Sequence, residues 1–470
     1  MCIRDRDSGD TITIPAGATI TNNGTAAGFG ATGAASWDTT VKTTGFTAVS
    51  GVGYFVNTTG GAISVNLPTG TAGAVVAIKD YANTFDTNAV TLVQNGSDKI
   101  GGSTVNATLS TEGLAVTLVF IDSTQGWLVT DNGTQDTAPT AQYVTATGGT
   151  ITECGNFKIH KFTGPGTFCV SNVGNAAGST TVDYLVVAGG ASGGIGNTAG
   201  GAGGGAGGVR VSPGTASGCW TASPLGASPA VALPVAVQGY PIAVGAGGAG
   251  KGPGANGQSG NCGSVSTFST ITSTGGGKGA GHDGASGPGG SGGGGSPISA
   301  PVRSGGSGNT PPVSPPQGNN GGDGQPSAGS KYPSGGGGGA AAVGTKQPNN
   351  CSPGGPGGAG IQINICGSNY YWAGGGAGSG YGLPGGDGGI GGGGGGSSSG
   401  TENGGGCGGA AGGSAINTAP AATPVNGGSG AANSGSGGGG AVGGGAPIGG
   451  PGASGSGGSG IVIIRYKFQN

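Results

Sequence analysis

The hydrophobic positions of this chain predict β-strands, and no stretch shows the period of an amphipathic helix. Between residues 35 and 137, short segments of about six residues are rich in β-branched and aromatic side chains. These segments are 53–58, 62–68, 74–81, 89–94, 114–122 and 126–130. Asn95-Gly96 and Asn132-Gly133 have the composition of hairpin turns with positive φ. The pattern therefore predicts a small β-sandwich-like module over residues 35–137.

The residues before this module divide into two parts. Residues 7–34 alternate threonine and isoleucine and contain the turn sequence Pro15-Ala16-Gly17, which predicts a short β-repeat or shaft segment. Residues 1–6, MCIRDR, match the translation of a transposase sequencing adaptor. We therefore expect residues 1–6 to be an assembly scar outside the fold.

Two apolar segments bracket the glycine-rich region. Residues 182–187 precede it and residues 461–466 follow it, and both have the length and composition of strands. A free linker does not end in a strand that needs a partner. The pattern therefore predicts one β core, from which glycine-rich segments leave and to which the chain returns at its C-terminus. Its strands are expected at about 145–190, 240–277 and 460–468.

Composition sharpens this picture because 126 of the 470 residues are glycine, against an average of about 7%. Disordered chains are rich in charge and poor in hydrophobic residues, whereas this chain is 7% charged and 33% hydrophobic. Its formal net charge of −2 argues against nucleic acid and anionic membrane surfaces as partners. The chain has no apolar run long enough to cross a membrane as a helix, so we expect no membrane insertion.

Three kinds of structure are compatible with such a high glycine content: collagen, a flexible linker and packed polyproline-II-type helices. Collagen requires glycine at every third position, and residues 391–396 and 415–426 break that frame. A flexible linker conflicts with the bracketing strands. Polyproline-II-type helices have three residues per turn and no internal hydrogen bonds, and without Cβ atoms they can pack closely and bond laterally. We therefore predict an all-β chain whose domain at 138–470 carries a polyglycine-II helix bundle on a β core.

The cysteines leave two interpretations open. Cys2 lies in the expected scar, which leaves an odd number of cysteines. The chain has no Cys-x-x-Cys pair and only two histidines, so we expect no metal site. The thiols are either free or joined in a few disulfides of an extracellular protein, with Cys154–Cys169 and Cys351–Cys366 the pairs nearest in sequence. The remaining cysteines are Cys154, Cys169, Cys219, Cys262, Cys351, Cys366 and Cys407.

Candidates for catalysis are weak, and we expect neither an enzyme nor a cofactor. His282-Asp283 lies in a glycine loop without a placed nucleophile, and His160 is expected to face solvent from a strand. The Gly-x-Gly-x-x-Gly matches lack the helix that a nucleotide site needs. Four carboxylates of the first module suit glycan hydrolysis, calcium binding or simple turn capping. These are Asp80, Asp86, Asp98 and Asp122.

Aromatic residues interrupt the glycine-rich region at Tyr370, Tyr371 and Trp372. Adjacent aromatics on a loop cannot all enter one core, so they either pack in part or form a receptor-contacting patch. Arg303 and Tyr332 occupy other interruptions and are further candidates for ligand contact. These five residues are the predicted receptor-binding positions.

Residues 145–468 resemble the glycine-rich domain of bacteriophage tail-fibre proteins. The resemblance rests on an ordered series of anchors: GNFKIHKFTGPGTF, VDYLVVAGGASGG, YPIAVGAGGAG, GSVSTFSTITSTGGG and GSGIVIIRYKF. Residues 10–135 similarly resemble β modules of marine phage tail fibres, through DTITIPAGATITNNGTA, GYFVNTTGGAISVNLP, KDYANTFDTN and GWLVT. Related phage adhesins carry packed polyglycine-II helices with receptor-binding loops at the tip.

This resemblance implies a distal adhesin of a virion tail fibre. Its expected partners are a bacterial cell-surface receptor, either an outer-membrane protein or a surface glycan, and other tail-fibre subunits, with a homotrimer typical of fibre shafts. A cellular extracellular structural protein or surface adhesin is the alternative. A fibre that degrades host polysaccharide is the third interpretation.

Overall fold

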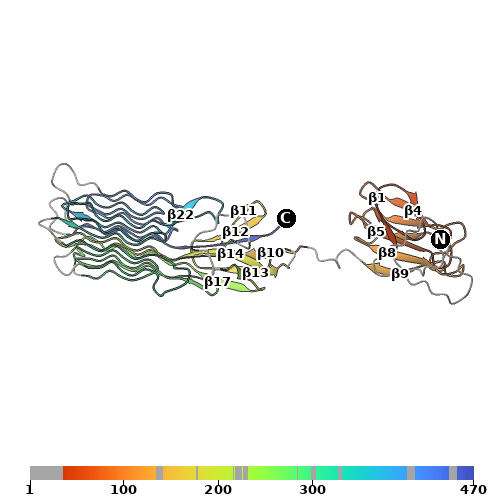
Figure 1. The fold of residues 1–470 in the computed structure, drawn as a ribbon, viewed down its shortest axis with the longest axis horizontal. Coiled ribbons are helices and arrows are strands. Elements are labelled where there is room, and N and C mark those ends of the chain that lie inside the picture. Colours follow the sequence, from red (N-terminus) through yellow and green to blue (C-terminus); the bar gives the residue numbers. More distant parts are fainter. Residues whose placement is uncertain are drawn as a thin grey trace, which may run out of the picture. The chain divides into compact units, whose positions relative to one another are not determined.

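The protein is described by a computed structural model that divides into two compact units, Met1–Thr140 and Ala141–Asn470 (Figure 1). Every regular element in the described part of the chain is a β-strand, which confirms the all-β class. The expected scar at 1–6 and the β-repeat at 7–34 lie outside the described residues. Described are residues 35–133, 141–175, 178–214, 216, 225, 231–282, 284–297, 303–326, 331–399, 408–443 and 452–469.

The first unit is built from two sheets. One sheet has the order β1-β3-β5-β8-β9 and the other the order β2-β4-β6-β7. The strands of the first sheet are β1 (Ser36–Lys42), β3 (Val52–Val56), β5 (Val75–Asp80), β8 (Ala115–Phe120) and β9 (Trp127–Gly133). Those of the second are β2 (Phe46–Thr47), β4 (Ile63–Asn66), β6 (Val90–Val93) and β7 (Ala107–Leu109).

From β1 to β6 the chain coils between these sheets. Successive strands alternate from one sheet to the other, so β1, β3 and β5 are parallel neighbours, as are β2, β4 and β6. Parallel neighbours need a crossover, and here a strand of the opposite sheet supplies it. The prediction of two hairpin turns is wrong for one of them. Asn95-Gly96 does lie in a turn, between β6 and β7, but Asn132-Gly133 lies inside β9.

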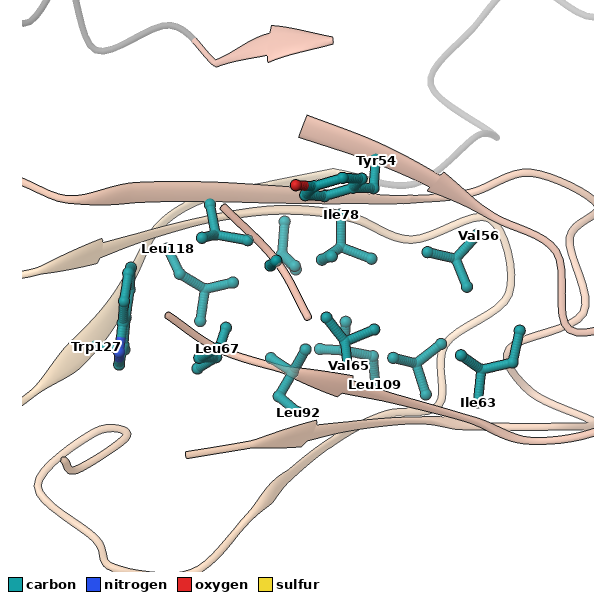
Figure 2. Packing of buried hydrophobic residues seen from close by; sticks show 14 of the residues in the cluster. Tyr54, Val56, Ile63, Val65, Leu67, Ile78, Leu92, Leu109, Leu118 and Trp127 are labelled. Atoms are coloured by element: carbon teal, nitrogen blue, oxygen red, sulfur yellow. The ribbon is translucent and has the colours of Figure 1, made fainter. Parts of the chain in front are cut away.

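The core of the first unit lies between its two sheets (Figure 2). Tyr54 and Leu118 enter it from one sheet, and Val65 and Leu92 enter it from the other. Trp127 is also completely buried in this cluster. Buried positions alternate with more exposed ones along β4 and β8, because each strand turns one face to the core and one away from it.

The second unit contains a β core of two sheets. One has the order β10-β13-β17-β18-β19: Val144–Thr147, Gly166–Val173, Gly239–Ala243, Ser266–Phe268 and Ile271–Ser273. The other has the order β11-β12-β24-β14-β15: Thr150–Cys154, Phe157–Phe162, Ile461–Lys467, Thr181–Val187 and Val209–Val211. Short strand β16 (Leu233–Pro234) also pairs with β14. Two further pairs are β20 (Tyr332–Pro333) with β23 (Gly380–Tyr381), and β21 (Ile361–Ile363) with β22 (Tyr370–Trp372).

The two strands that bracket the glycine-rich region are direct neighbours. Strand β24 pairs antiparallel with β14, and Val187 stands opposite Ile461. Val462 and Ile464 belong to the core between the sheets, whereas Ile461 and Ile463 belong to a second core with the β21–β22 hairpin. Because both faces of β24 are covered, its sequence is apolar without alternation. The predicted β core that the C-terminal strand closes is confirmed.

Residues 200–208 show how the glycine-rich region is ordered. The N–H groups of 201–208 donate to carbonyls of other segments at 2.8–3.2 Å, and the accepting segment recurs every third residue. The donor and acceptor pairs are Gly201 to Ala441, Gly204 to Gly438 and Gly207 to Gly435; Ala202 to Ala280, Gly205 to Gly277 and Gly208 to Thr274; Gly203 to Gly335 and Ala206 to Gly338. A period of three residues is that of a polyproline-II-type helix.

The carbonyl groups of the same helix accept from three further segments. The donors in these segments are Gly194, Ala191 and Ala188; Ser379 and Gly376; Gly294 and Ser291. Residues 200–208 therefore have six hydrogen-bonded neighbours, three through their N–H groups and three through their carbonyls. This arrangement is a polyglycine-II bundle, in which backbones without side chains satisfy one another laterally.

Candidate functional site

The bundle of the second unit has two ends that differ in their surroundings. At one end residues 200–208 continue into β15, where the β core lies. We call this the sheet end, and we call the end near Gly200 the far end. Eight steps of a polyproline-II-type helix, at about 3.1 Å each, separate the two ends by about 25 Å.

The predicted aromatic patch lies at the sheet end. Tyr370, Tyr371 and Trp372 form β22, which pairs with β21 and lies beside the β core (Figure 1). The Trp372 side chain is 0% exposed, and its indole N–H donates to the Ile363 carbonyl at 3.0 Å. The prediction of an exposed contact is wrong for Trp372, because the β21–β22 hairpin packs on an apolar face of the β core and buries this ring.

The two tyrosines beside Trp372 are half-buried. The Tyr370 ring meets the Trp372 ring edge-on, with centroids 6.0 Å apart, and packs against the same core. The Tyr371 N–H donates to the Ser414 carbonyl at 2.9 Å. Receptor contact by Tyr370 and Tyr371 stays a prediction.

Tyr332 lies at the far end of the bundle. The Gly335 carbonyl accepts from the Gly203 N–H. The Gly338 carbonyl accepts from the Ala206 N–H, three residues later in both segments. The segments therefore run parallel, and Tyr332 lies near Gly200. Tyr332 in β20 pairs with Tyr381 in β23, and their rings meet at 5.7 Å with an interplanar angle of 75°. The sequence pattern does not single out Tyr381, which is one aromatic residue at the end of a glycine run.

Arg303 lies at the same far end. The Gly335 N–H, three residues after Tyr332, donates to the Gly295 carbonyl. The Arg303 carbonyl lies beside Gly295 and accepts from the Gly324 N–H at 3.1 Å. The Arg303 side chain is half-buried, and its Nε is buried without a hydrogen-bond partner among the described residues. The structure therefore brings Arg303 and Tyr332 to one end of the bundle and leaves residues 370–372 at the other.

The far end also carries an exposed ion pair. The Lys346 ammonium lies 3.8 Å from the Asp323 carboxylate, and the Thr345 carbonyl next to it accepts from Gly336. Long polar side chains at this end contrast with the interior of the bundle. There, a Cβ on Gly337 would overlap a backbone carbonyl of a neighbouring segment.

His160 does not take part in a catalytic pair with a carboxylate. The expectation that it faces solvent is wrong, because β12 lies inside its sheet and the ring is buried against Phe168 and Tyr466. Its Nδ1 lies 2.8 Å from the Gly148 carbonyl, and its Nε2 lies 3.1 Å from the Tyr466 hydroxyl. Burial lowers the pKa of His160 and raises the pKa of Tyr466 to about 12.

The carboxylates of the first unit hold turns. Asp80 is buried and accepts the backbone N–H groups of Thr84, Phe85 and Gly113 at 3.0–3.2 Å. Asp122 accepts from two residues of its own turn at 2.7 and 2.8 Å. These contacts favour turn capping over a hydrolytic pair.

Two further expectations concern metal and acid–base chemistry. Asp283, the second residue of the weak His282-Asp283 candidate, lies outside the described residues. Within the described ranges, no group of three or more His, Cys, Asp or Glu residues is placed to hold a metal ion.

The cysteine pairs nearest in sequence are not joined. Cys154 ends β11 and Cys169 lies in β13, which belongs to the other sheet. Cys366 lies in the β21–β22 hairpin at the sheet end. Cys351 precedes Gly355, whose N–H donates to the Ser334 carbonyl at the far end. The five described cysteines are free thiols. The other three, Cys2, Cys219 and Cys407, lie outside the described residues.

Comparison with known proteins gives a family for most of the second unit. The family model described as a glycine-rich domain matches residues 162–432, and no curated protein matches the chain. Among the described residues, no helix has the length and apolar character needed to cross a membrane. The matched residues make up more than half of the sequence and include most of the polyglycine-II bundle, so the chain belongs to the glycine-rich domain family.

Proposed function

We propose that this chain is the distal adhesin of a phage tail fibre and binds a bacterial surface receptor without covalent chemistry. The observation that carries the proposal is the contrast between the two parts of the bundle. Its interior is a hydrogen-bonded lattice of backbones, whereas the segments that join its helices at the far end carry polar and aromatic side chains. A fixed scaffold that presents variable loops is the usual design of a recognition protein.

The residues at the far end have the chemistry of a binding surface. Tyr332 and Tyr381 supply a pair of half-buried rings, and Arg303 supplies a guanidinium with a buried Nε that lacks a partner among the described residues. Tyrosine and arginine are among the residue types that contribute most at interfaces.

The proposal also covers assembly. We propose that the protein belongs to the virion tail fibre, where the first unit contributes to a shaft or collar and copies of the chain associate with other fibre subunits as a homotrimer. Several fibres that bind at once would multiply weak contacts, because each further contact is intramolecular. An outer-membrane protein loop or a surface glycan would serve as the receptor.

Attachment of the labelled full chain to a panel of bacterial isolates, marine species included, tests the proposal. We expect binding to a subset of strains. In those strains Arg303→Ala and Tyr332→Ala should weaken binding by about tenfold or more, as expected for central interface residues. Tyr81→Ala in the first unit, whose side chain is 57% exposed, is the matched control and should bind as the unchanged protein does.

Each of three results would overturn a different part of this proposal. If the folded chain attaches to no strain, the adhesin function fails. If Tyr371→Ala abolishes attachment and Tyr332→Ala does not, the receptor binds at the sheet end instead. Release of sugar from the bound cells would indicate a fibre that degrades polysaccharide.

A further inference from the structure

We infer that Cys154 and Cys366 form a disulfide on oxidation, which joins the β11–β12 hairpin to the β21–β22 hairpin. The two residues are far apart in sequence, and neither of the pairings suggested by sequence proximity includes both of them. The bond would lie at the sheet end of the bundle. It is independent of the proposed function, whose residues lie at the far end.

The first observation is a close approach between the two hairpins. Cys154 is the last residue of β11, and Cys366 and Gly367 lie in the turn between β21 and β22. A Cβ placed on Gly367 would lie 3.5 Å from the Cys154 sulfur. The Cys154 thiol therefore lies beside the turn that contains Cys366, within reach of a side chain at position 367.

A second set of contacts fixes the same pair of hairpins. Arg465 of β24 donates from Nη1 to the Ile365 carbonyl at 3.2 Å, and its guanidinium lies 4.5 Å from the centre of the Phe157 ring. Phe157 is the cross-strand partner of Cys154. Arg465 thus bridges the residue before Cys366 and the residue opposite Cys154, which keeps both cysteines on the same side of the sheet.

Both thiols are accessible. Cys154 is exposed and Cys366 is half-exposed. The described hydrogen-bond contact of the Cys366 sulfur is a weak 3.9 Å approach to the Ser368 carbonyl. Gly367 has a φ of 88°, and residues 367–369 of the turn are exposed. The inferred bond requires this exposed turn to bring the Cys366 sulfur to the bonding distance of a disulfide.

The chemistry needs an oxidant, and glutathione disulfide is sufficient. The Cys154 thiolate attacks one sulfur of glutathione disulfide and releases one reduced glutathione, leaving a mixed disulfide. The Cys366 thiolate then attacks the Cys154 sulfur and releases the second glutathione. Two protein thiols are oxidised, one glutathione disulfide is reduced, and the two thiol protons go to the two glutathione thiols.

The bond would hold the β21–β22 hairpin on the β core. Ile361, Ile363 and Trp372 of this hairpin pack in one core with Ile461 and Ile463 of β24. Opening of the hairpin exposes that face of the sheet and the peptide bonds after the two tyrosines of β22. The oxidised protein is therefore expected to resist chymotrypsin at these two tyrosines.

Peptide mapping of the full chain tests the inference. The protein is equilibrated with oxidised and reduced glutathione, alkylated, digested with trypsin and chymotrypsin, and examined by mass spectrometry. We expect a peptide that links Cys154 to Cys366 with a mass about 2 Da below the sum of its reduced parts, because two hydrogens are lost. The link should be absent from C154S and from C366S and present in the matched controls C169S and C262S.

Protease digestion gives a second readout that does not depend on the variants folding identically. Chymotrypsin should cut after Tyr370 and Tyr371 several times more slowly in the oxidised protein than in the same sample after reduction. C366S should show no such difference. Alkylation of both Cys154 and Cys366 at all glutathione ratios, or links from either residue to another cysteine, would overturn the inference.

Discussion

The first unit and the polyglycine-II bundle both have buried interiors, but they bury different atoms. In the first unit the interior consists of side chains such as Leu118 and Trp127, which the two sheets enclose. In the bundle the interior consists of peptide groups, and Gly204 donates to Gly438 and accepts from Gly376 without contributing any side chain. The comparison shows that a chain can form an interior without a conventional hydrophobic core, provided that its backbone donors find lateral acceptors.

The two interiors differ in what holds them. Burial of apolar side chains stabilises the first unit by about 25 cal/mol per Å². In the bundle a hydrogen bond contributes about 1 kcal/mol net, against an ordering cost of about 1–2 kcal/mol for each backbone residue. The lattice therefore depends on the β core at its sheet end, where β14 and β24 hold the first and last glycine segments together.

The largest effect is expected from a single methyl group inside the bundle. A Cβ on Gly204 would overlap the carbonyl oxygen of Ala191, which accepts from Gly438. Gly204→Ala must therefore displace hydrogen-bonded backbones and leave buried groups unpaired, at a cost of about 4 kcal/mol. Thermal unfolding followed by calorimetry should show that the transition of the second unit falls or disappears while that of the first is unchanged.

Gly413→Ala is the matched control for this variant. Gly413 also lies in a glycine segment and accepts from Gly391, but its Cβ position is open, with no atom within 4 Å. The control should leave the unfolding temperature within the experimental error. Equal destabilisation by the two variants would show that glycine is needed for its backbone freedom rather than for close packing.

The reverse experiment removes side-chain atoms from the first unit. Leu118 is completely buried between the two sheets, and Leu118→Ala should lower the free energy of unfolding of this unit by about 3 kcal/mol. Val129→Ala on the neighbouring strand is the control, because that side chain is 51% exposed. Urea unfolding monitored by tryptophan fluorescence measures both. A lower free energy of unfolding of the second unit, instead of the first, would contradict the division of the chain into two units.

Sequence pattern located most strands of the first unit because strand composition is a local property. The six expected segments coincide with β3, β4, β5, β6, β8 and β9. The pattern missed β1 because this strand lies at the edge of its sheet with mostly exposed side chains. It missed β2 and β7 because they have two and three residues. The parallel coil could not be predicted, because the pattern of one strand does not reveal which strand it pairs with.

The candidate site shows the same limit. Adjacent aromatics at 370–372 suggested an exposed loop, but the hairpin places them in a strand whose last ring packs in the core with β24. Each glycine segment carries the chain from one end of the bundle to the other, so the end at which an interruption lies depends on the number of segments before it. Arg303 and Tyr332 share the far end for this reason, which no local feature of either residue shows.

A buried carboxylate offers a smaller test of the first unit. Asp80 accepts three backbone N–H groups, and Asp80→Ala, which leaves these donors without partners, should cost about 2 kcal/mol. Asp86→Ala is the control, since its carboxylate is exposed and its described contact is to the adjacent threonine hydroxyl. Urea unfolding of the first unit measures the difference. Equal effects of the two changes would show that the three hydrogen bonds add no stability.

Mild acid should lower the free energy of unfolding of the second unit more than that of the first. We expect this effect to be smaller than those of the substitutions above. Both histidines of the chain lie in the second unit. Burial lowers the pKa of His160, the hydrogen bond to the Gly148 carbonyl opposes that shift, and Lys158 adds to it. A carbonyl can only accept, so the neutral ring donates from Nδ1 to Gly148 and accepts at Nε2 from Tyr466. Protonation would replace that acceptor with a second donor.

The sign of the pH effect follows from the lowered pKa of His160. Above the ordinary histidine value of about 6.5 the ring is neutral in the folded and unfolded states, so its contribution to stability is complete. As the pH falls below that value the unfolded chain binds the proton first, and stability is lost until the folded pKa is reached. Calorimetry between about pH 7.5 and 4.5 should therefore show the second unit losing stability over a range in which the first changes little. His160→Gln, which keeps a donor and an acceptor but cannot titrate, should remove most of this difference; an unchanged pH profile in that variant would assign the loss to other groups.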